Sequence, residues 1–284
     1  MFPPALVSED VAQPSGDEPT ATVPTNVAQY ADGSRLAARW SLHERFSTNP
    51  TPWPVWVFDH LLTFGSELRV LEIGCGLGQL WAQNIDRVPS AWSLTLTDAS
   101  AGMVEATTEA VAGLASPVEV RPVRADQPLP FDDGEFDLAV AAHMLYHLPD
   151  PTSTVAELAR VLAPPGTLAV TTNGRHHQTE LYDLAAGGRA DDRFSFAREF
   201  AVLVDEFDDV TFARRPDELR VTEAEAVIGY LRSLPEQRGF SENAAEQVRR
   251  QLNEEIASNG YWRARKDVGL FLARRRRPPT PIER

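Results

Sequence analysis

Three glycines at alternate positions, Gly74, Gly76 and Gly78, follow an apolar run that carries one acid, Glu72. Glycine has no Cβ, so a glycine-rich turn lets the backbone approach a ligand closely. If a helix follows the turn, its N-terminus adds unpaired N–H groups that favour an anionic group of the ligand. The loop therefore predicts a ligand site at the end of a first strand.

Two further acids follow later apolar runs. Asp98 ends LTLTD and lies 20 residues after Gly78, about the separation at which an acid accepts ribose hydroxyls. Asp126 stands in VRADQPLPF, after a third run. The carboxyl ends of neighbouring parallel strands share one edge, and such sheets bind ligands there. We expect the three acids to serve one ligand.

The spacing also limits the kind of ligand. A dinucleotide fingerprint needs a third glycine where this chain has Gln79, and Gly78 falls one residue early. A P-loop is excluded because no Gly-Lys-Ser/Thr follows. A nicotinamide dehydrogenase is therefore a weak alternative.

Strand-like and helix-like segments alternate strictly around these residues, which predicts a parallel sheet covered on both faces. Two capping-box sequences, Thr154-x-x-Glu157 and Thr222-x-x-Glu225, each predict the start of a helix. Ser241 is predicted to cap the N-terminus of a third helix. The expected strands are 69–73, 93–98, 118–125, 136–141, 167–172 and a final strand over 267–272, and the expected helices are 34–46, 53–62, 77–84, 99–112, 153–162 and 193–207.

Four regions follow from composition and pattern. Residues 1–28 are rich in Pro, Ser, Thr and acids and are predicted to be a disordered tail. Residues 29–62 form a helical cap and 63–174 the ligand-binding core. Residues 175–284 combine a helical lid insert with the remaining core elements.

Charge and cysteine content narrow the partners. The 284 residues include 27 Lys and Arg against 41 Asp and Glu, a net charge of −14 that disfavours nucleic acid. The single cysteine, Cys75, signals no oxidising compartment. Neither a signal peptide nor an apolar run of membrane-spanning length is found. We expect a cytoplasmic protein without nucleic-acid or membrane partners; its oligomeric state is left open.

Five motifs, in their order along the chain, resemble those of the class I S-adenosylmethionine-dependent methyltransferases. They are VLEIGCGLG, LTLTDAS, RADQPLPF, FDLAVAAHMLYHLPDP and LARVLAPPGTLAVTTNG. Within that class the chain is most similar to the ubiquinone/menaquinone-methyltransferase-like small-molecule branch, closely over residues 65–174 and loosely elsewhere. The resemblance implies a Rossmann-like, doubly wound, seven-stranded α/β sheet whose last strand is antiparallel, with the helical cap and an insert after the fifth strand.

The resemblance also assigns cofactor residues. It implies that the loop binds the methionine part of S-adenosylmethionine, that Asp98 binds both ribose hydroxyls, and that Asp126 accepts from the adenine amino group. The full set that it implies is Glu72, Gly74, Cys75, Gly76, Gly78, Asp98, Ala99, Met103, Asp126, Gln127 and His143. Cys75 stands at a variable position, where a small packed residue is favoured over a nucleophile.

Histidine is the natural base at neutral pH for a methyl transfer that needs one. His143 and His147 stand four apart in HMLYH, and His177 follows the fifth strand. We expect His143 to line the cofactor pocket, and His147 and His177 to be the candidate catalytic residues. A zinc site is not indicated, because no thiol or carboxylate cluster has ligand spacing.

Aromatic residues crowd the segment before the first strand, and the helix over 193–207 is amphipathic, so we expect an apolar pocket for a small acceptor. The candidate substrate residues are Tyr30, Trp40, His177, Glu180 and Phe200. The predicted activity is methyl transfer to an O, N or C nucleophile of a small molecule, as in secondary metabolism. A cofactor-binding relative with a cyclase or hydroxylase-like reaction, and a non-catalytic binding protein, remain alternatives.

Overall fold

The computed structural model describes residues 34–184, 195–234 and 240–275, and these residues are built around one seven-stranded sheet. Its strand order is β3-β2-β1-β4-β5-β7-β6, in which β7 runs antiparallel to both β5 and β6 and the other neighbours are parallel. The predicted doubly wound sheet with an antiparallel last strand is confirmed. The strands are β1 (Arg69–Ile73), β2 (Ser93–Asp98), β3 (Val118–Pro122), β4 (Phe136–Ala142), β5 (Leu162–Asn173), β6 (Asp209–Val221) and β7 (Trp262–Arg274).

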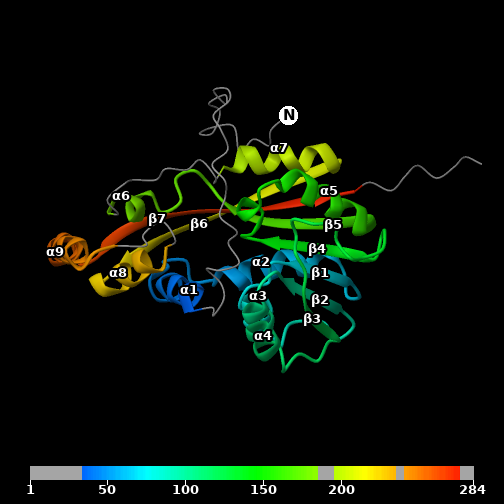
Figure 1. Ribbon diagram of the computed structural model, residues 1–284, viewed down its shortest axis with the longest axis horizontal. Coiled ribbons are helices and arrows are strands. Elements are labelled where there is room, and N and C mark those ends of the chain that lie inside the picture. Colours follow the sequence, from blue (N-terminus) through cyan, green and yellow to red (C-terminus); the bar gives the residue numbers. More distant parts are fainter. Residues whose placement is uncertain (1–33, 185–194, 235–239, 276–284) are drawn as a thin grey trace, which may run out of the picture.

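Helices cover both faces of the sheet, as Figure 1 shows. On one face α5 and α7 pack together over β5, β6 and β7, and on the other α2, α3 and α4 cover β1 and β2. The helices are α1 (Ser34–Phe46), α2 (Trp53–Leu61), the 3-10 turn η3 (Leu62–Phe64), α3 (Gln79–Ala82), α4 (Ala101–Ala110), the 3-10 turn η4 (Leu145–His147), α5 (Pro151–Val161), α6 (Thr179–Leu184), α7 (Phe196–Glu206), α8 (Ala224–Ser233) and α9 (Glu242–Asn259).

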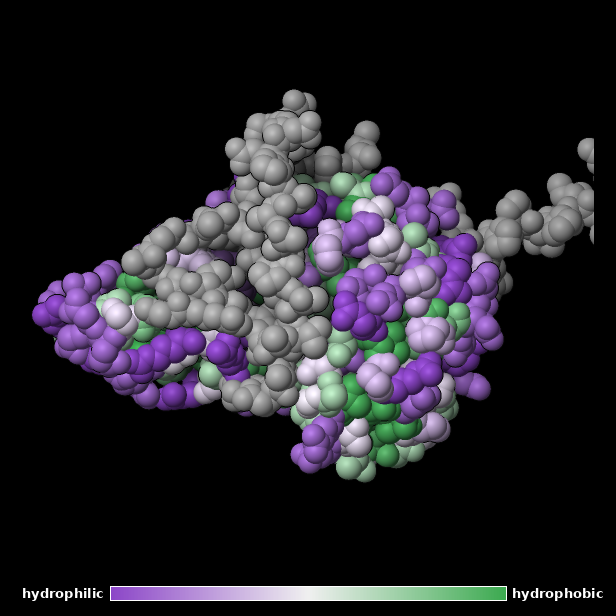
Figure 2. Space-filling model, in the orientation of Figure 1, coloured by the Kyte–Doolittle hydropathy of each residue, from purple (hydrophilic) through white to green (hydrophobic). Residues whose placement is uncertain are grey.

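β6 and β7 extend past the end of β5 and carry a second hydrophobic cluster. The pairing of β5 with β7 stops at Asn173–Val268, whereas β6 and β7 remain paired as far as Val221–Trp262. Helices α1, α8 and α9 pack on this extension through Leu42, Ile228 and Leu252, among others. Figure 2 shows that this end of the molecule is mostly hydrophilic on the visible face.

Several predicted boundaries are wrong in instructive ways. Helix α5 begins one residue after Asp150, whose side chain accepts from the N–H groups of Thr152 and Ser153, so the box at Thr154 is not its cap. Thr154 instead donates to the carbonyl of Ala125 at 2.7 Å. The N-cap of α8 is Glu223 rather than Thr222, whereas Ser241 does cap α9. The third strand ends at Pro122, short of Ala125.

Within the described ranges, no helix combines the length and apolar character needed to cross a bilayer.

Candidate functional site

The glycine loop leaves β1 in a conformation that suits glycine. Gly74, Gly76 and Gly78 have φ values of +70°, +58° and +68°, which L side chains rarely adopt. A Cβ on Gly74 would lie 3.0 Å from Cβ of Met144, so the loop also packs closely against the segment after β4. The Cys75 N–H donates to the carbonyl of Thr97 at 2.9 Å, which fastens the loop to the end of β2.

Two carboxylates lie directly behind this loop. Asp98 accepts from the Gly76 N–H at 3.0 Å and from the Ser100 N–H at 2.9 Å, so it joins the loop to the start of α4. Glu72, which is 2% exposed, accepts from Nε1 of Trp81 at 2.5 Å. Burial raises the pKa of Glu72 to about 7 and also raises the pKa of Asp98. Both acids therefore lie where a cationic or hydroxyl-bearing ligand would stabilise their charged forms.

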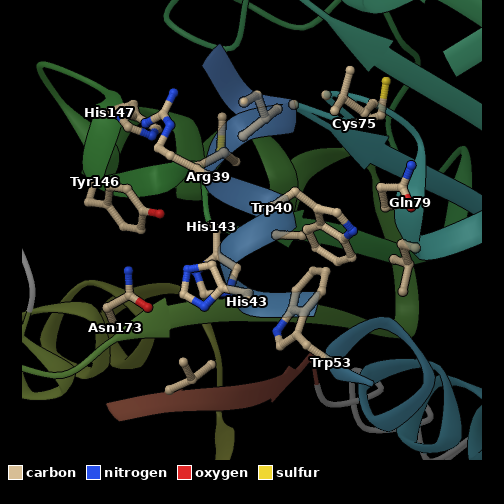
Figure 3. A pocket seen from close by; sticks show the side chains of 18 of the residues that line it. Arg39, Trp40, His43, Trp53, Cys75, Gln79, His143, Tyr146, His147 and Asn173 are labelled. Carbon is tan, nitrogen blue, oxygen red and sulfur yellow. The ribbon is translucent and has the colours of Figure 1, made fainter. Parts of the chain in front are cut away.

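A single cavity of about 950 Å³ brings these acids together with residues from the cap and the far strands. Figure 3 shows aromatic and histidine side chains around the space, with Cys75 and Gln79 on one side and Tyr146, His147 and Asn173 on the other. Of the predicted cofactor residues, the cavity is lined by Glu72, Gly74, Cys75, Gly76, Asp98, Ala99, Met103, Asp126 and His143.

Two of the predicted cofactor residues lie away from the cavity wall. Gly78 is buried at the N-terminus of α3, where a Cβ would lie 3.2 Å from Oγ1 of Thr107. Gln127 is exposed, one residue beyond Asp126. Asp126 itself pairs with Arg124 at 2.6 Å and borders the cavity.

Cys75 lines the cavity but is only 8% exposed, and its Sγ lies 3.4 Å from Oγ1 of Thr107. Burial raises the pKa of this thiol, which disfavours the nucleophilic thiolate.

His143 takes an unusual position between β4 and η4. Its φ is +53°, and its N–H donates to the carbonyl of Thr171 at 3.0 Å. Its ring lies 5.0 Å from the indole of Trp53. Among the described residues, neither the buried Nδ1 of His143 nor the buried Nε1 of Trp53 has a hydrogen-bond partner. Burial, with a contribution from Lys266, lowers the pKa of His143 to about 4, so the ring is neutral at physiological pH.

The two candidate catalytic histidines both line the cavity. His147 ends η4, and its ring lies 4.5 Å from that of Tyr146. His177 accepts the N–H of Asp267 on Nδ1 at 3.1 Å, which places the proton of the neutral ring on Nε2. In this tautomer Nε2 carries the proton, so His177 cannot take up a further proton there as a base.

Of the predicted substrate residues, Trp40 and His177 border the cavity and two others do not. Phe200 is buried in the core with its ring 6.3 Å from that of Phe271, because α7 packs on the sheet instead of closing over the site. Glu180 accepts from the N–H of Arg265 at 3.0 Å, at the start of α6. Tyr30 lies outside the described residues.

A polar chain that we did not anticipate lines the cavity beside α1. The hydroxyl of Tyr230 donates to Oε1 of Gln178 at 2.6 Å, and Nε2 of Gln178 lies 3.0 Å from Nε2 of His43. An amide nitrogen can only donate, so His43 accepts on Nε2 and carries its proton on Nδ1. Burial, then the charge of Lys266, lowers the pKa of His43 well below its usual value, in agreement with a neutral ring.

Lys266 of β7 completes this side of the cavity. Its Nζ lies 2.5 Å from Oδ2 of Asp217, which also accepts from Arg215 at 2.5 Å and from Ser47 at 2.6 Å. For the polar residues on this side of the cavity, the only signal in the sequence is that Gln178 is adjacent to His177. No motif marks Lys266, Asp217 or Tyr230, because they come from separate strands and helices.

The comparisons with known proteins agree with this architecture. Residues 71–170 match the family model described as "Methyltransferase domain". The chain is 32% identical over 108 residues to the ubiquinone biosynthesis O-methyltransferase of a Caulobacter species and 30% identical over 114 residues to that of Pseudomonas aeruginosa. These matches cover 38% and 40% of this chain, and 42% and 48% of those relatives, so the chain spans less than half the length of either.

Solved structures show the same fold at low sequence identity. Phosphoethanolamine N-methyltransferase 2 of Haemonchus contortus, solved with phosphomonomethylethanolamine and S-adenosylhomocysteine, superposes with a TM-score of 0.57 at 17% identity, covering 89% of this chain and 60% of that one. The YcgJ protein of Bacillus subtilis gives 0.53 at 18% identity, covering 78% and 98%. The chain therefore carries a methyltransferase domain and has the fold of the class I S-adenosylmethionine-dependent methyltransferases.

Proposed function

We propose that this protein is an S-adenosylmethionine-dependent methyltransferase that acts on a small molecule. The observation that carries the proposal is the cradle formed by the glycine loop and the acids behind it. Gly74 and Gly76 keep side chains out of the cavity, and Glu72, Asp98 and Asp126 border the same space. A nucleoside with hydroxyl donors and a positively charged sulfonium fits such a set of carboxylates.

When bound, this cofactor would supply an already activated methyl group. The work left to the protein is to position an acceptor, exclude water and, where needed, take up a proton. Glu72, Gly74, Gly76 and Asp98 would hold the cofactor, with Met103 and Asp126 nearer its base. His147 is the candidate base, and a histidine-to-alanine change there that leaves turnover unaltered would restrict it to packing.

The acceptor is proposed to be a small, partly apolar molecule. The cavity volume of about 950 Å³ lies at the upper end of the range for small-molecule sites, roughly 300–1,000 Å³. Trp40, Trp53, Leu36 and Val268 give it apolar walls. The acceptor of the ubiquinone relatives is not carried over, since the family match ends before α6, α8 and β7, which line this part of the cavity.

Calorimetry tests the cofactor assignment. S-adenosylhomocysteine should bind the wild-type protein while NADH should not. Asp98→Asn should weaken S-adenosylhomocysteine binding by about 10- to 100-fold, the equivalent of roughly 1.5–3 kcal/mol for a lost charged hydrogen bond. Unchanged affinity in that variant would remove Asp98 from the site, and NADH binding would favour the dehydrogenase alternative. Transfer of labelled methyl to candidate acceptors would separate an enzyme from a protein that only binds the cofactor.

A further inference from the structure

The polar residues at the edge of the cavity differ between the part of the sheet around β1 and the part around β7. The acids Glu72 and Asp98 lie on β1 and β2, and Asp126 follows β3. On the other side, His143, Asn173 and Lys266 stand on or after β4, β5 and β7. Three strand spacings separate β1 from β7, a lateral distance of about 14 Å at ~4.8 Å per strand. The β7 side of the cavity is thus far enough from the glycine loop to bind a different chemical group.

A buried cluster behind the β7 side of the cavity has more positive than negative charge. Lys266 and Arg215 share one carboxylate, Asp217, and their side chains are 6%, 1% and 0% exposed. Nε of Arg215 has no hydrogen-bond partner among the residues that the structure describes. Burial lowers the pKa of Lys266 even though Asp217 acts to raise it. A buried charge that is not fully compensated is costly, and a nearby anion would offset it.

Neutral donors point to the same kind of ligand. His43 carries its proton on Nδ1, because Gln178 donates to Nε2, and no described residue accepts from that Nδ1. The buried Nε1 of Trp53, which can only donate, is likewise unpaired among those residues. Both side chains line the cavity. Glu44 also lines it, but it is exposed on α1, where solvent screens its charge.

We propose that the methyl acceptor is a small apolar molecule with a carboxylate, and that Lys266 Nζ and His43 Nδ1 bind that carboxylate on the β7 side of the cavity. This inference rests on the proposed methyltransferase function and adds the class of acceptor. A singly charged carboxylate matches the excess of one positive charge in the cluster. The apolar body would lie against Trp40 and Leu36, toward the glycine loop.

Ligand pairs that differ only in charge test the proposal. Benzoate, 2-naphthoate and 2-anthroate, each beside its carboxamide, are titrated into protein saturated with S-adenosylhomocysteine, and binding is measured by calorimetry. At least one carboxylate should bind about tenfold or more tightly than its amide, as expected for a charge-assisted hydrogen bond. Equal affinity of every acid and amide pair, or no binding of any acid, would overturn the proposal.

Variants assign the preference to the named residues. Lys266→Met leaves Arg215 paired with Asp217, and it should reduce the preference for carboxylates to about threefold or less while Lys266→Arg retains it. Arg263→Met removes a positive charge from an exposed side chain of the same strand and should change nothing. His43→Phe keeps a ring and removes the donor, so it should weaken carboxylate binding more than amide binding, since a hydrogen bond to a charged acceptor is the stronger of the two. This variant also provides a test if Lys266→Met does not fold.

The controls separate two kinds of failure. If wild-type protein does not bind S-adenosylhomocysteine, the proposed function itself is wrong. If S-adenosylhomocysteine binds and the carboxylate preference is absent, the acceptor class is wrong. If the preference is present but survives in Lys266→Met, the assignment of carboxylate binding to Lys266 is wrong.

Discussion

At the scale of single residues, we expect the charge of Glu72 to respond to the cofactor. Burial raises its pKa to about 7, so the charge of this carboxylate changes near neutral pH. The sulfonium of S-adenosylmethionine would favour the ionised form and release a proton on binding. We expect its affinity to rise about tenfold between pH 6 and pH 8, the range over which the ionised fraction of Glu72 grows by that factor.

The matched ligand for this experiment is S-adenosylhomocysteine, which lacks the positive sulfur and should show a smaller rise. Glu72→Gln should flatten the pH dependence for S-adenosylmethionine. Proton release is measured by calorimetry in buffers of different ionisation enthalpy. Identical pH profiles for the two ligands would show that Glu72 does not respond to the sulfonium.

The residues that could be predicted from sequence are those in contiguous motifs. Glu72 and the glycines lie within a few positions of each other, and Asp98 follows at a recognisable distance. Lys266, by contrast, meets Asp217 of another strand and Ser47, which lies near the other end of the chain. Their meeting depends on how β6, β7 and the end of α1 pack, and no local pattern encodes that.

At the scale of elements, the turn after β1 makes a prediction about glycine. Gly74→Ala combines a φ of +70° with a Cβ placed 3.0 Å from Met144, so it should lower stability by about 1–3 kcal/mol and weaken S-adenosylhomocysteine binding. Gly260→Ala, also at positive φ but with open space around it, should lower stability alone. Gly229→Ala, at an exposed position of helix α8 with open space around it, should stabilise the protein by roughly 0.5–1 kcal/mol.

Denaturant unfolding and calorimetry measure these three variants side by side. If Gly74→Ala behaves like Gly260→Ala in both measurements, close packing of the loop has no role in ligand binding.

The elements themselves were predictable where hydrophobic runs are continuous, and β6 was not. Its sequence, DVTFARRPDELRV, is rich in charge and contains Pro216, features typical of a turn. It forms a strand because it lies at the edge of the sheet, where β7 is its only neighbouring strand among the described residues and where proline is tolerated. Helix α7 was located correctly, but its amphipathic face was assigned to a lid instead of to the sheet.

At the scale of the whole molecule, Asp217 joins parts that are distant in sequence. Its carboxylate accepts from Ser47, Thr48 and Asn49 after α1, and it pairs with Arg215 of β6 and Lys266 of β7. The helical cap is thereby fastened to the extended end of the sheet, and α1 carries Trp40 and His43 into the cavity. One buried carboxylate thus links the global stability of the protein to the shape of the β7 side of the cavity.

Asp217→Asn should therefore destabilise the protein by about 3–5 kcal/mol, because it leaves two buried cations without their anion. Burial acts to raise the pKa of Asp217, but the ion pair with Lys266 and the hydrogen bonds outweigh it, and the net pKa is lowered. For a lowered carboxyl pKa the stabilisation is complete above the unfolded value near 3.8 and is lost as the pH falls below it. Urea unfolding at pH 7 and at pH 3 should therefore show a larger difference in stability between wild type and Asp217→Asn at pH 7.

Asp137→Asn is the control: it breaks an ion pair with Arg69 in which both side chains are partly exposed, and it should lower stability by at most about 1 kcal/mol. Equal effects of the two substitutions would mean that Asp217 does not hold the cap to the sheet.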